Sequence, residues 1–215
     1  MIIVLLGPPG AGKGTQGDLI AGRAGIPKIA TGDVLRSAVK AGTPQGLAAK
    51  AAMDRGDLVP DGVILGIMKD ALASPVAANG AILDGVVRTV PQAEGLQRVL
   101  AELDRSLDAV VIFDVPDEEL VRRLSGRTVC DTCQTPYTGR DPGERCEKCG
   151  GRLVRRKDDE PDAVRNRLAV YARQTAPVID WYRTHGLRVV HVDAVGTTDQ
   201  VLTRVMGSLG DGKGQ

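Results

Sequence analysis

The stretch that decides the fold is Met1-Ile2-Ile3-Val4-Leu5-Leu6-Gly7-Pro8-Pro9-Gly10-Ala11-Gly12-Lys13-Gly14-Thr15. Its first part is a short apolar run typical of a buried parallel strand. Its second part satisfies the pattern G-x-x-x-x-G-K. Glycines let backbone N–H groups converge on phosphate oxygens, and a following helix adds the positive end of its dipole. The sequence therefore predicts a strand, a phosphate-binding loop and a helix that hold a nucleoside triphosphate.

The side chains of this loop and of one later strand suit phosphoryl transfer. Lys13 is placed to bridge the β- and γ-phosphates, and the loop hydroxyl stands one position later than usual, at Thr15. Asp84 ends another apolar run, where an acid is positioned to hold magnesium through water. The competing interpretations are a glycine-rich turn without ligand and an aspartate that caps a strand. The agreement of strand, spacing, lysine and helix favours the phosphate site.

Four more short apolar runs, separated by helical stretches, indicate βαβ units and a parallel sheet of five strands. They are Lys28–Ala30, Ala81–Asp84, Ala109–Asp114 and Arg188–Asp193. Helical spacing also predicts one long helix from about Asp159 to Thr184. Two stretches interrupt the alternation: residues 31–60 look helical throughout, and the region around 128–157 holds all the cysteines. The polar tail 210–215 is expected to be disordered.

The four cysteines form two C-x-x-C knuckles, with Cys130 and Cys133 in the first and Cys146 and Cys149 in the second. This spacing is typical of tetrahedral Zn²⁺ held by four thiolates. Four thiolates leave no open coordination position, so the metal is expected to be structural and to fold a segment too small for its own core. The alternative is four thiols without metal.

Composition limits the other classes of function. The chain of 215 residues carries a net charge of +1, which gives no electrostatic case for nucleic-acid or membrane binding. Its first residues lack the basic start and cleavage site of a signal peptide, and no apolar run reaches the length of a membrane span. We therefore expect a cytoplasmic protein, without nucleic-acid or membrane partners.

Several motifs together resemble the adenylate kinase family along essentially the whole chain. They are Gly7-x-Pro9-Gly10-x-Gly12-Lys13-Gly14-Thr15-Gln16, Thr31-Gly32-Asp33-x-Leu35-Arg36, Leu83-Asp84-Gly85-x-x-Arg88-Thr89, Pro91-Gln92, Gly126-Arg127, Arg156-Lys157-Asp158-Asp159 and Arg165-x-Arg167-Leu168. The displaced Thr15 is part of that family's own pattern. The resemblance implies the P-loop nucleoside monophosphate kinase fold, a five-stranded parallel sheet flanked by helices. It implies a core of residues 1–30, 61–126 and 159–215, an acceptor-binding insertion at 31–60 and a zinc-binding lid at 127–158.

The resemblance also implies the activity, which is reversible, magnesium-dependent transfer between ATP and AMP to give two ADP, by a monomer. The implied catalytic residues are Lys13, Asp84, Arg88, Arg123, Arg156 and Arg167. The implied ATP-binding residues are Gly10, Ala11, Gly12, Lys13, Gly14, Thr15, Arg123, Arg127, Pro136, Tyr137 and Gly196. The implied AMP-binding residues are Thr31, Arg36, Asp57, Leu58, Val59, Gly85, Val86, Val87, Arg88, Gln92, Arg156 and Arg167. The implied metal ligands are Cys130, Cys133, Cys146 and Cys149.

The dispersed arginines support this interpretation independently. Two polyanionic nucleotides must be brought face to face, and planar guanidinium groups match phosphate geometry well. Arg36, Arg88 and Arg156 fall on separate segments, so only closure of the protein around its ligands would bring them together. Any one of them could be an ordinary surface arginine, but the set at these spacings favours a site.

One motif departs from the family pattern. The family usually has Asp-Gly-Phe-Pro-Arg, whereas this chain has Asp84-Gly85-Val86-Val87-Arg88. A non-proline cis peptide costs roughly 3 kcal/mol, so the Val86–Val87 bond is expected to be trans. The pair could reshape the acceptor pocket and weaken AMP binding, or neighbouring residues could compensate.

Two other functions compete with AMP phosphorylation. One is a kinase of UMP, CMP or GMP, because Val86 and Val87 are expected beside the acceptor base. The other is a nucleic-acid- or protein-binding zinc ribbon on an ATPase. The near-neutral charge and the position of the knuckles inside the expected lid argue against the second.

Overall fold

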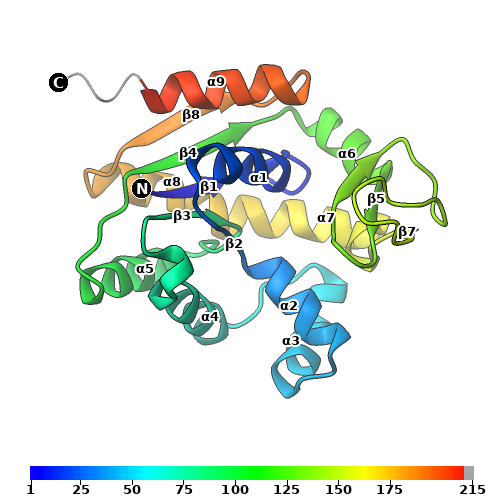
Figure 1. Cartoon of the computed structure of the whole chain (residues 1–215), viewed down its shortest axis with the longest axis horizontal. Coiled ribbons are helices and arrows are strands. Elements are labelled where there is room, and N and C mark those ends of the chain that lie inside the picture. Colours follow the sequence, from blue (N-terminus) through cyan, green and yellow to red (C-terminus); the bar gives the residue numbers. More distant parts are fainter. Residues whose placement is uncertain (211–215) are drawn as a thin grey trace.

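The computed structural model describes residues 1–210, so the predicted disorder of the tail falls, beyond Gly210, outside the described residues. Five parallel strands form one sheet of order β2-β3-β1-β4-β8 (Figure 1). They are β1 (Ile2–Leu6), β2 (Lys28–Ala30), β3 (Ala81–Asp84), β4 (Ala109–Asp114) and β8 (Val189–Asp193). The five predicted strands are confirmed, and only β8 begins one residue later than expected.

Helices cover both faces of this sheet because every central strand is apolar on both sides. On β1, Ile2, Val4 and Leu6 face one core cluster, while Ile3 and Leu5 face another. The first cluster packs against α4, α5 and α8, and the second against α1, α6 and α9. These helices are α1 (Lys13–Ala24), α4 (Asp61–Ala73), α5 (Val90–Glu102), α6 (Asp117–Ser125), α8 (Ala176–Thr184) and α9 (Thr198–Gly210), with a short 3₁₀ turn at Pro75–Ala77.

Residues 31–60 form two packed helices, α2 (Thr31–Lys40) and α3 (Pro44–Arg55), at the lower edge of the molecule in Figure 1. Thr43 caps the N-terminus of α3, since its hydroxyl accepts a hydrogen bond from the Gly46 N–H over 3.1 Å. Leu35 of α2 and Ala49 of α3 form a small separate apolar cluster with Val59 and with Ile64 of α4. The predicted helical character of this stretch is confirmed.

The cysteine-rich stretch folds into a small antiparallel sheet of order β6-β5-β7, to the right in Figure 1. Its strands are β5 (Arg127–Cys130), β6 (Pro136–Thr138) and β7 (Leu153–Val154), and a 3₁₀ turn at Lys157–Asp159 follows. The sequence analysis did not predict these strands, because two to four residues are too few for a periodic signal. The buried residues that cluster here are Cys130, Cys146 and Leu153.

The predicted long helix is continuous in path but not regular. It consists of α7 (Pro161–Val170), a π-helical turn (Tyr171–Thr175) and α8. Pro177 lacks an N–H, and in a regular α-helix its ring would clash with the carbonyl four residues earlier. The helix instead takes one extra residue into this turn, so that the Ala176 N–H donates to the carbonyl of Tyr171, five residues earlier. Within residues 1–210, no helix combines the length and apolarity that crossing a membrane requires.

Candidate nucleotide-binding and phosphoryl-transfer site

A cavity of about 620 Å³ opens beyond the carboxyl ends of β1 and β3. Ligands of open α/β sheets bind at this edge. The loop after β1, the helices α2 and α3, and the small sheet β5–β7 all contribute to its walls. The predicted nucleotide-site residues that line it are Gly10, Ala11, Gly12, Lys13, Gly14, Thr15, Thr31, Arg36, Asp57, Leu58, Val59, Asp84, Gly85, Arg88, Gln92, Arg123, Arg127, Pro136, Arg156, Arg167 and Gly196.

The phosphate loop has the backbone that its glycines permit. Gly10 and Gly12 have φ of +87° and +91°, a region that side-chain-bearing residues rarely adopt. Gly7 lies so close to β4 that a Cβ there would stand 2.9 Å from the Phe113 carbonyl oxygen. Lys13 curls back over the loop and donates to the carbonyls of Gly7 and Pro8 over 2.7 and 2.9 Å. The loop therefore holds the Lys13 ammonium in a fixed position at the cavity.

The environment of Lys13 weakens its hold on its proton. The pKa of Lys13 is lowered to about 8, chiefly by desolvation; the nearby carboxylate of Asp84 opposes this shift, and repulsion from Arg88, Arg167 and Arg127 adds to it. An anion beside the ammonium would oppose this shift. The charges around Lys13 also show that predicted arginines from separate segments of the chain lie close together in the cavity.

Acidic residues hold two of the arginines in position. Arg127 pairs with both carboxylate oxygens of Asp159, with Nε to Oδ2 at 2.7 Å. Arg167 donates from Nη1 to Asp159 Oδ1 over 3.0 Å and to the Asp158 carbonyl over 2.8 Å. Asp158 also pairs with Arg167 through its side chain, at 3.1 Å. The short turn that carries these acids thus fixes guanidinium groups from β5 and from α7.

Two other arginines of the cavity have a guanidinium nitrogen that is free to donate a hydrogen bond. The Nε atoms of Arg36 and Arg156 are buried and have no hydrogen-bond partner within residues 1–210. Desolvation and repulsion from Arg36 and Arg127 lower the pKa of Arg156 to about 9. Desolvation and repulsion from Arg167 also lower the pKa of Arg88. Phosphate oxygens would satisfy such donors and offset the mutual repulsion.

Asp84 and Thr15 suit a hydrated magnesium ion. Both line the cavity beside the phosphate loop, and both offer the oxygen ligands that Mg²⁺ prefers. A Cβ at position 14 would stand 3.3 Å from Asp84 Oδ2, which is closer than ordinary van der Waals contact. This close approach favours glycine at position 14.

The wall formed by α2, α3 and the start of α4 is apolar. Its side chains are Leu35, Met53, Val59 and Ile64, and the buried amide of Gln92 stands beside them. An apolar wall with one polar amide suits a nucleotide base. Nearby, Thr31 donates from its hydroxyl to the Gly85 carbonyl over 2.8 Å and so ties α2 to the loop after β3.

Val86 and Val87 do not lie where the sequence analysis expected them. Both side chains are fully buried in the core cluster under α4, α5 and α8, and neither lines the main cavity. Two adjacent apolar side chains at a strand's end are drawn into the core by burial. Their peptide bond is trans, as predicted, since residues 1–210 contain no cis peptide. Val87 does line a smaller adjoining pocket, together with Lys13, Leu58 and Arg88.

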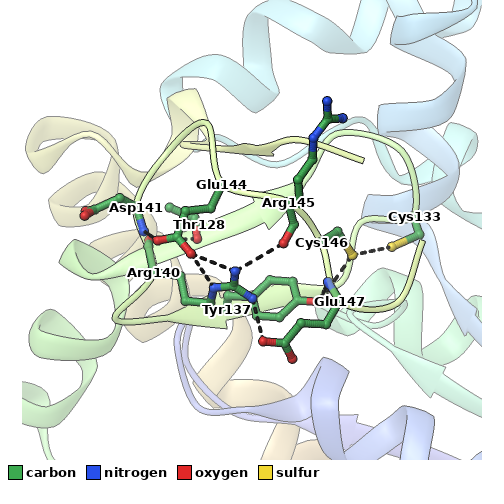
Figure 2. Close-up of polar contacts among 9 residues, drawn as sticks. All are labelled: Thr128, Cys133, Tyr137, Arg140, Asp141, Glu144, Arg145, Cys146 and Glu147. Atoms are coloured by element: carbon green, nitrogen blue, oxygen red, sulfur yellow. Dashed lines mark hydrogen bonds and ion pairs between the residues drawn. The ribbon is translucent and has the colours of Figure 1, made fainter. Parts of the chain in front are cut away.

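Tyr137 is also placed differently from the prediction. Neighbouring side chains of a strand point to opposite sides, and on β6 Pro136 and Thr138 line the cavity whereas Tyr137 does not. Figure 2 shows its ring directed at the second cysteine knuckle, with the hydroxyl 3.2 Å from Cys146 Sγ and 3.2 Å from the Glu147 N–H. The Tyr137 side chain therefore supports the knuckle and not the cavity wall.

Arg140 completes this support (Figure 2). Its guanidinium carbon lies 5.3 Å from the centroid of the Tyr137 ring, and its nitrogens pair with Glu144 and Glu147. The contact combines cation–π attraction with charge-assisted hydrogen bonds. The turn that leads to Cys146 is thereby held against β6.

The four cysteine sulfurs lie within 4.8 Å of one another. Cys130 Sγ is 3.4 Å from Cys149 Sγ, and Cys133 Sγ is 3.6 Å from Cys146 Sγ. Four sulfurs at about 2.3 Å from a tetrahedral zinc ion would be separated by nearly this distance. The N–H groups of Thr132 and Cys133 both point at Cys130 Sγ, at 3.4 Å, which favours a thiolate. The residues fit Zn²⁺, and none of the four forms a disulfide.

The opposite end of the cavity adjoins α6 and the loop before α9. Arg123 donates to Glu119 over 2.7 Å and to the Ala194 carbonyl over 2.9 Å, so it joins the two segments. Gly196 lines the cavity with φ of +124°. The Gln16 amide nitrogen donates to the Thr198 carbonyl over 2.8 Å, which attaches this loop to α1.

Sequence reasoning missed several residues of the cavity wall. Asp33 pairs with Arg36, Asp158 pairs with Arg167, and Lys148 of the second knuckle also faces the cavity. The motif Arg156-Lys157-Asp158-Asp159 carried a signal for the acids, since an acid near clustered arginines is a natural partner. Lys148 had no such signal, because only the fold of the small sheet turns it toward the cavity.

The fold and the site define a class, the phosphate-loop α/β proteins with a polycationic cavity between two insertions. The comparisons with known proteins narrow that class. A family model described as adenylate kinase matches residues 5–187. A protein named adenylate kinase from Gemmatimonas aurantiaca is 66% identical over 211 residues, which cover 97% of this chain and 99% of the relative. Similarly named proteins are 47% identical in Methanothrix thermoacetophila, covering 95% of this chain and 96% of the relative, and 46% identical in Syntrophobacter fumaroxidans, covering 98% and 100%. The chain belongs to the adenylate kinase family.

Proposed function

We propose that the protein transfers the γ-phosphate of ATP to AMP, and catalyses the reverse reaction from two ADP. The observation that carries this proposal is the convergence of Lys13, Arg88, Arg156 and Arg167 on one cavity that is also lined by the apolar wall near Gln92 and by the loop before α9. The family assignment and the names of the relatives support it.

The geometry suggests how the roles divide. The backbone of residues 10–15 and Lys13 hold the donor phosphates, and Arg123, Arg127 and Gly196 adjoin the donor nucleoside. Arg36 and Arg88 hold the acceptor phosphate, while Thr31, residues 57–59 and Gln92 surround its base. Arg156 and Arg167 face the phosphoryl group in transit. Such preorganised cations stabilise charge that spreads over the phosphoryl oxygens in the transition state.

The two insertions already touch across the cavity. Lys40 at the end of α2 donates to the Asp131 carbonyl over 3.1 Å, and Lys157 approaches Asp54 of α3 at 4.0 Å. We infer that 31–60 is an acceptor-binding unit, that 127–158 is a lid, and that both close on 1–30, 61–126 and 159–215. Closure excludes water and assembles the arginines around the reacting groups.

Two metals complete the proposal. Mg²⁺ bound near Asp84 and Thr15 would neutralise developing charge on the donor phosphates. Zn²⁺ held by Cys130, Cys133, Cys146 and Cys149 would be structural, because four thiolates leave no position for a reactant. The sequence-based expectation of a cytoplasmic monomer stays a prediction, which size-exclusion chromatography and cell fractionation check.

The alternative functions are not favoured. Val86 and Val87 are buried and neither lines the main cavity, which argues against a different acceptor or weakened AMP binding. The relatives over nearly the whole chain are named adenylate kinase, not kinases of other nucleotides or zinc-ribbon binding modules.

Formation of ADP from ATP and AMP with magnesium tests the proposal. We expect turnover by the purified chain and a loss of at least about a hundredfold in kcat/KM for Lys13→Ala or Arg88→Ala. The control is Arg98→Ala, because Arg98 is exposed on α5 and does not line the cavity. Phosphorylation of UMP, CMP or GMP in preference to AMP would contradict the assignment of the acceptor.

A further inference from the structure

The side-chain amide of Gln92 is held by two partners of opposite polarity. Its oxygen accepts a hydrogen bond from the Arg88 backbone N–H over 2.7 Å. Its nitrogen donates to Asp61 Oδ1 over 2.7 Å. Gln92 is buried, with a relative exposure of 1%, so water does not substitute for either partner.

The contacts of Asp61 keep its carboxylate in place. Asp61 is the first residue of α4, where a negative charge is favoured by the helix dipole. The same oxygen, Oδ1, also accepts from the Thr89 hydroxyl over 3.2 Å, and Thr89 caps α5 by accepting from the Gln92 N–H. Asp61 therefore joins the start of α4 to the start of α5 through Thr89 and Gln92.

These partners leave the amide only one favourable orientation. An ionised carboxylate only accepts hydrogen bonds and a backbone N–H only donates. Reversing the amide would direct its oxygen at Asp61 and its NH₂ group at the Arg88 N–H, so both contacts would become repulsive. In the observed orientation one amide hydrogen and one oxygen lone pair remain unused, since each atom has a single partner within residues 1–210.

The unused hydrogen and lone pair of the Gln92 amide match a purine that carries an amino group at position 6. Gln92 borders the cavity beside Leu35, Val59 and Ile64, the apolar wall assigned above to the acceptor base. An amide oxygen accepts from a 6-amino group, and the amide N–H donates to the neighbouring ring nitrogen. A 6-oxopurine presents an acceptor at position 6, so it would need the reversed amide.

We propose that Asp61 is a positioning residue that fixes the Gln92 amide and thereby makes the acceptor site select a 6-aminopurine over a 6-oxopurine. The proposal rests on the proposed function, in which Gln92 faces the acceptor base. Asp61 acts through Gln92 and does not itself line the cavity.

The test compares AMP with inosine 5′-monophosphate, which differs at position 6 and lacks an added 2-amino group. Steady-state kcat and KM are measured for both acceptors with ATP and magnesium, in the wild-type chain, Asp61→Ala and Asp61→Asn. Asp70→Ala is the matched control, because Asp70 is exposed on the same helix α4. The KM for ATP and the melting temperature are recorded for every variant.

The wild-type chain is expected to favour AMP by at least about a hundredfold in kcat/KM, because a misoriented amide leaves buried polar groups unpaired. Asp61→Ala is expected to lower that preference at least about tenfold, mainly through a higher KM for AMP. Asp61→Asn retains an acceptor oxygen, so it should keep most of the preference, and Asp70→Ala should keep all of it.

Two results would overturn the proposal. One is a wild-type chain that uses both acceptors equally, a measurement that needs no variant. The other is Asp61→Ala with a lowered melting temperature and an unchanged AMP preference, which would make Asp61 only a structural link. A wild-type chain that phosphorylates neither purine would instead refute the proposed function.

Discussion

The hydroxyl of Thr175 donates to the backbone carbonyl of Arg88 over 2.9 Å. Thr175 is buried in the π-helical turn before Pro177, whereas Arg88 stands in the loop after β3. With the bond from Thr31 to the Gly85 carbonyl, it holds that loop at both ends. The π-helical turn thus helps to hold the loop that carries Arg88, on the acceptor-phosphate side of the cavity.

Thr175→Val keeps the shape of this side chain and removes its donor. We expect a free energy of unfolding lower by about 1–2 kcal/mol, because the Arg88 carbonyl loses its buried partner. The KM for AMP should rise about three- to tenfold, and the KM for ATP should stay unchanged. Steady-state kinetics and urea unfolding check this. Thr184→Val is the control, since Thr184 makes a similar bond to a backbone carbonyl but is exposed on α8. Equal effects of the two variants would contradict the prediction.

Lys13 should make ATP binding pH-dependent. Its pKa in the free protein is lowered to about 8, and donor phosphates should raise it again. Below about pH 8 the ammonium is intact and affinity is full, whereas above it the free protein loses that charge and affinity falls with rising pH. Binding at pH 8–9 should therefore take up a proton, which calorimetry in buffers of different ionisation enthalpy measures. Lys13→Arg should abolish the uptake, and persistent uptake in that variant would assign it to another group.

Removal of zinc should unfold the small sheet β5–β7 and spare the core. Its apolar cluster of buried residues, Cys130, Cys146 and Leu153, offers too little apolar surface to fold by itself. We expect about one zinc per chain, and for Cys146→Ser a loss of metal with rapid proteolysis between residues 127 and 158.

Tyr137→Phe serves as the control for that variant. It deletes only the hydroxyl beside Cys146 Sγ, so it should keep the zinc and cost about 1 kcal/mol. Metal analysis and limited proteolysis distinguish the two. Unchanged protection of residues 127–158 after metal removal would show that the segment folds without zinc.

Restoration of the usual family residue at position 86 should harm stability. Val86 is fully buried in the core cluster, so the larger ring of Val86→Phe would overpack it, at a cost of about 1–3 kcal/mol. The dissociation constant for AMP should change little, because this side chain does not line the cavity. Thermal unfolding and AMP titration measure the two effects. A large gain in AMP affinity would revive the hypothesis that valine here weakens acceptor binding.

Much of the fold could be predicted because its signals are local. The strands β1, β2, β3, β4 and β8 are short apolar runs, and burial on both faces demands that composition. The π-turn could not be predicted from periodicity, although Pro177 was visible, because several local adjustments relieve a proline in a helix. The strands of the small sheet were too short to leave a pattern.

The sequence by itself determined the phosphate loop, the cysteine set and the identity of many residues around the cavity. Each of these depends on residue types at fixed spacing along the chain. Only the tertiary structure decided which way side chains face: Tyr137 toward Cys146, Val86 into the core, and the Gln92 amide between Arg88 and Asp61. Those choices depend on burial and on hydrogen-bond partners from distant segments, and no local pattern records them.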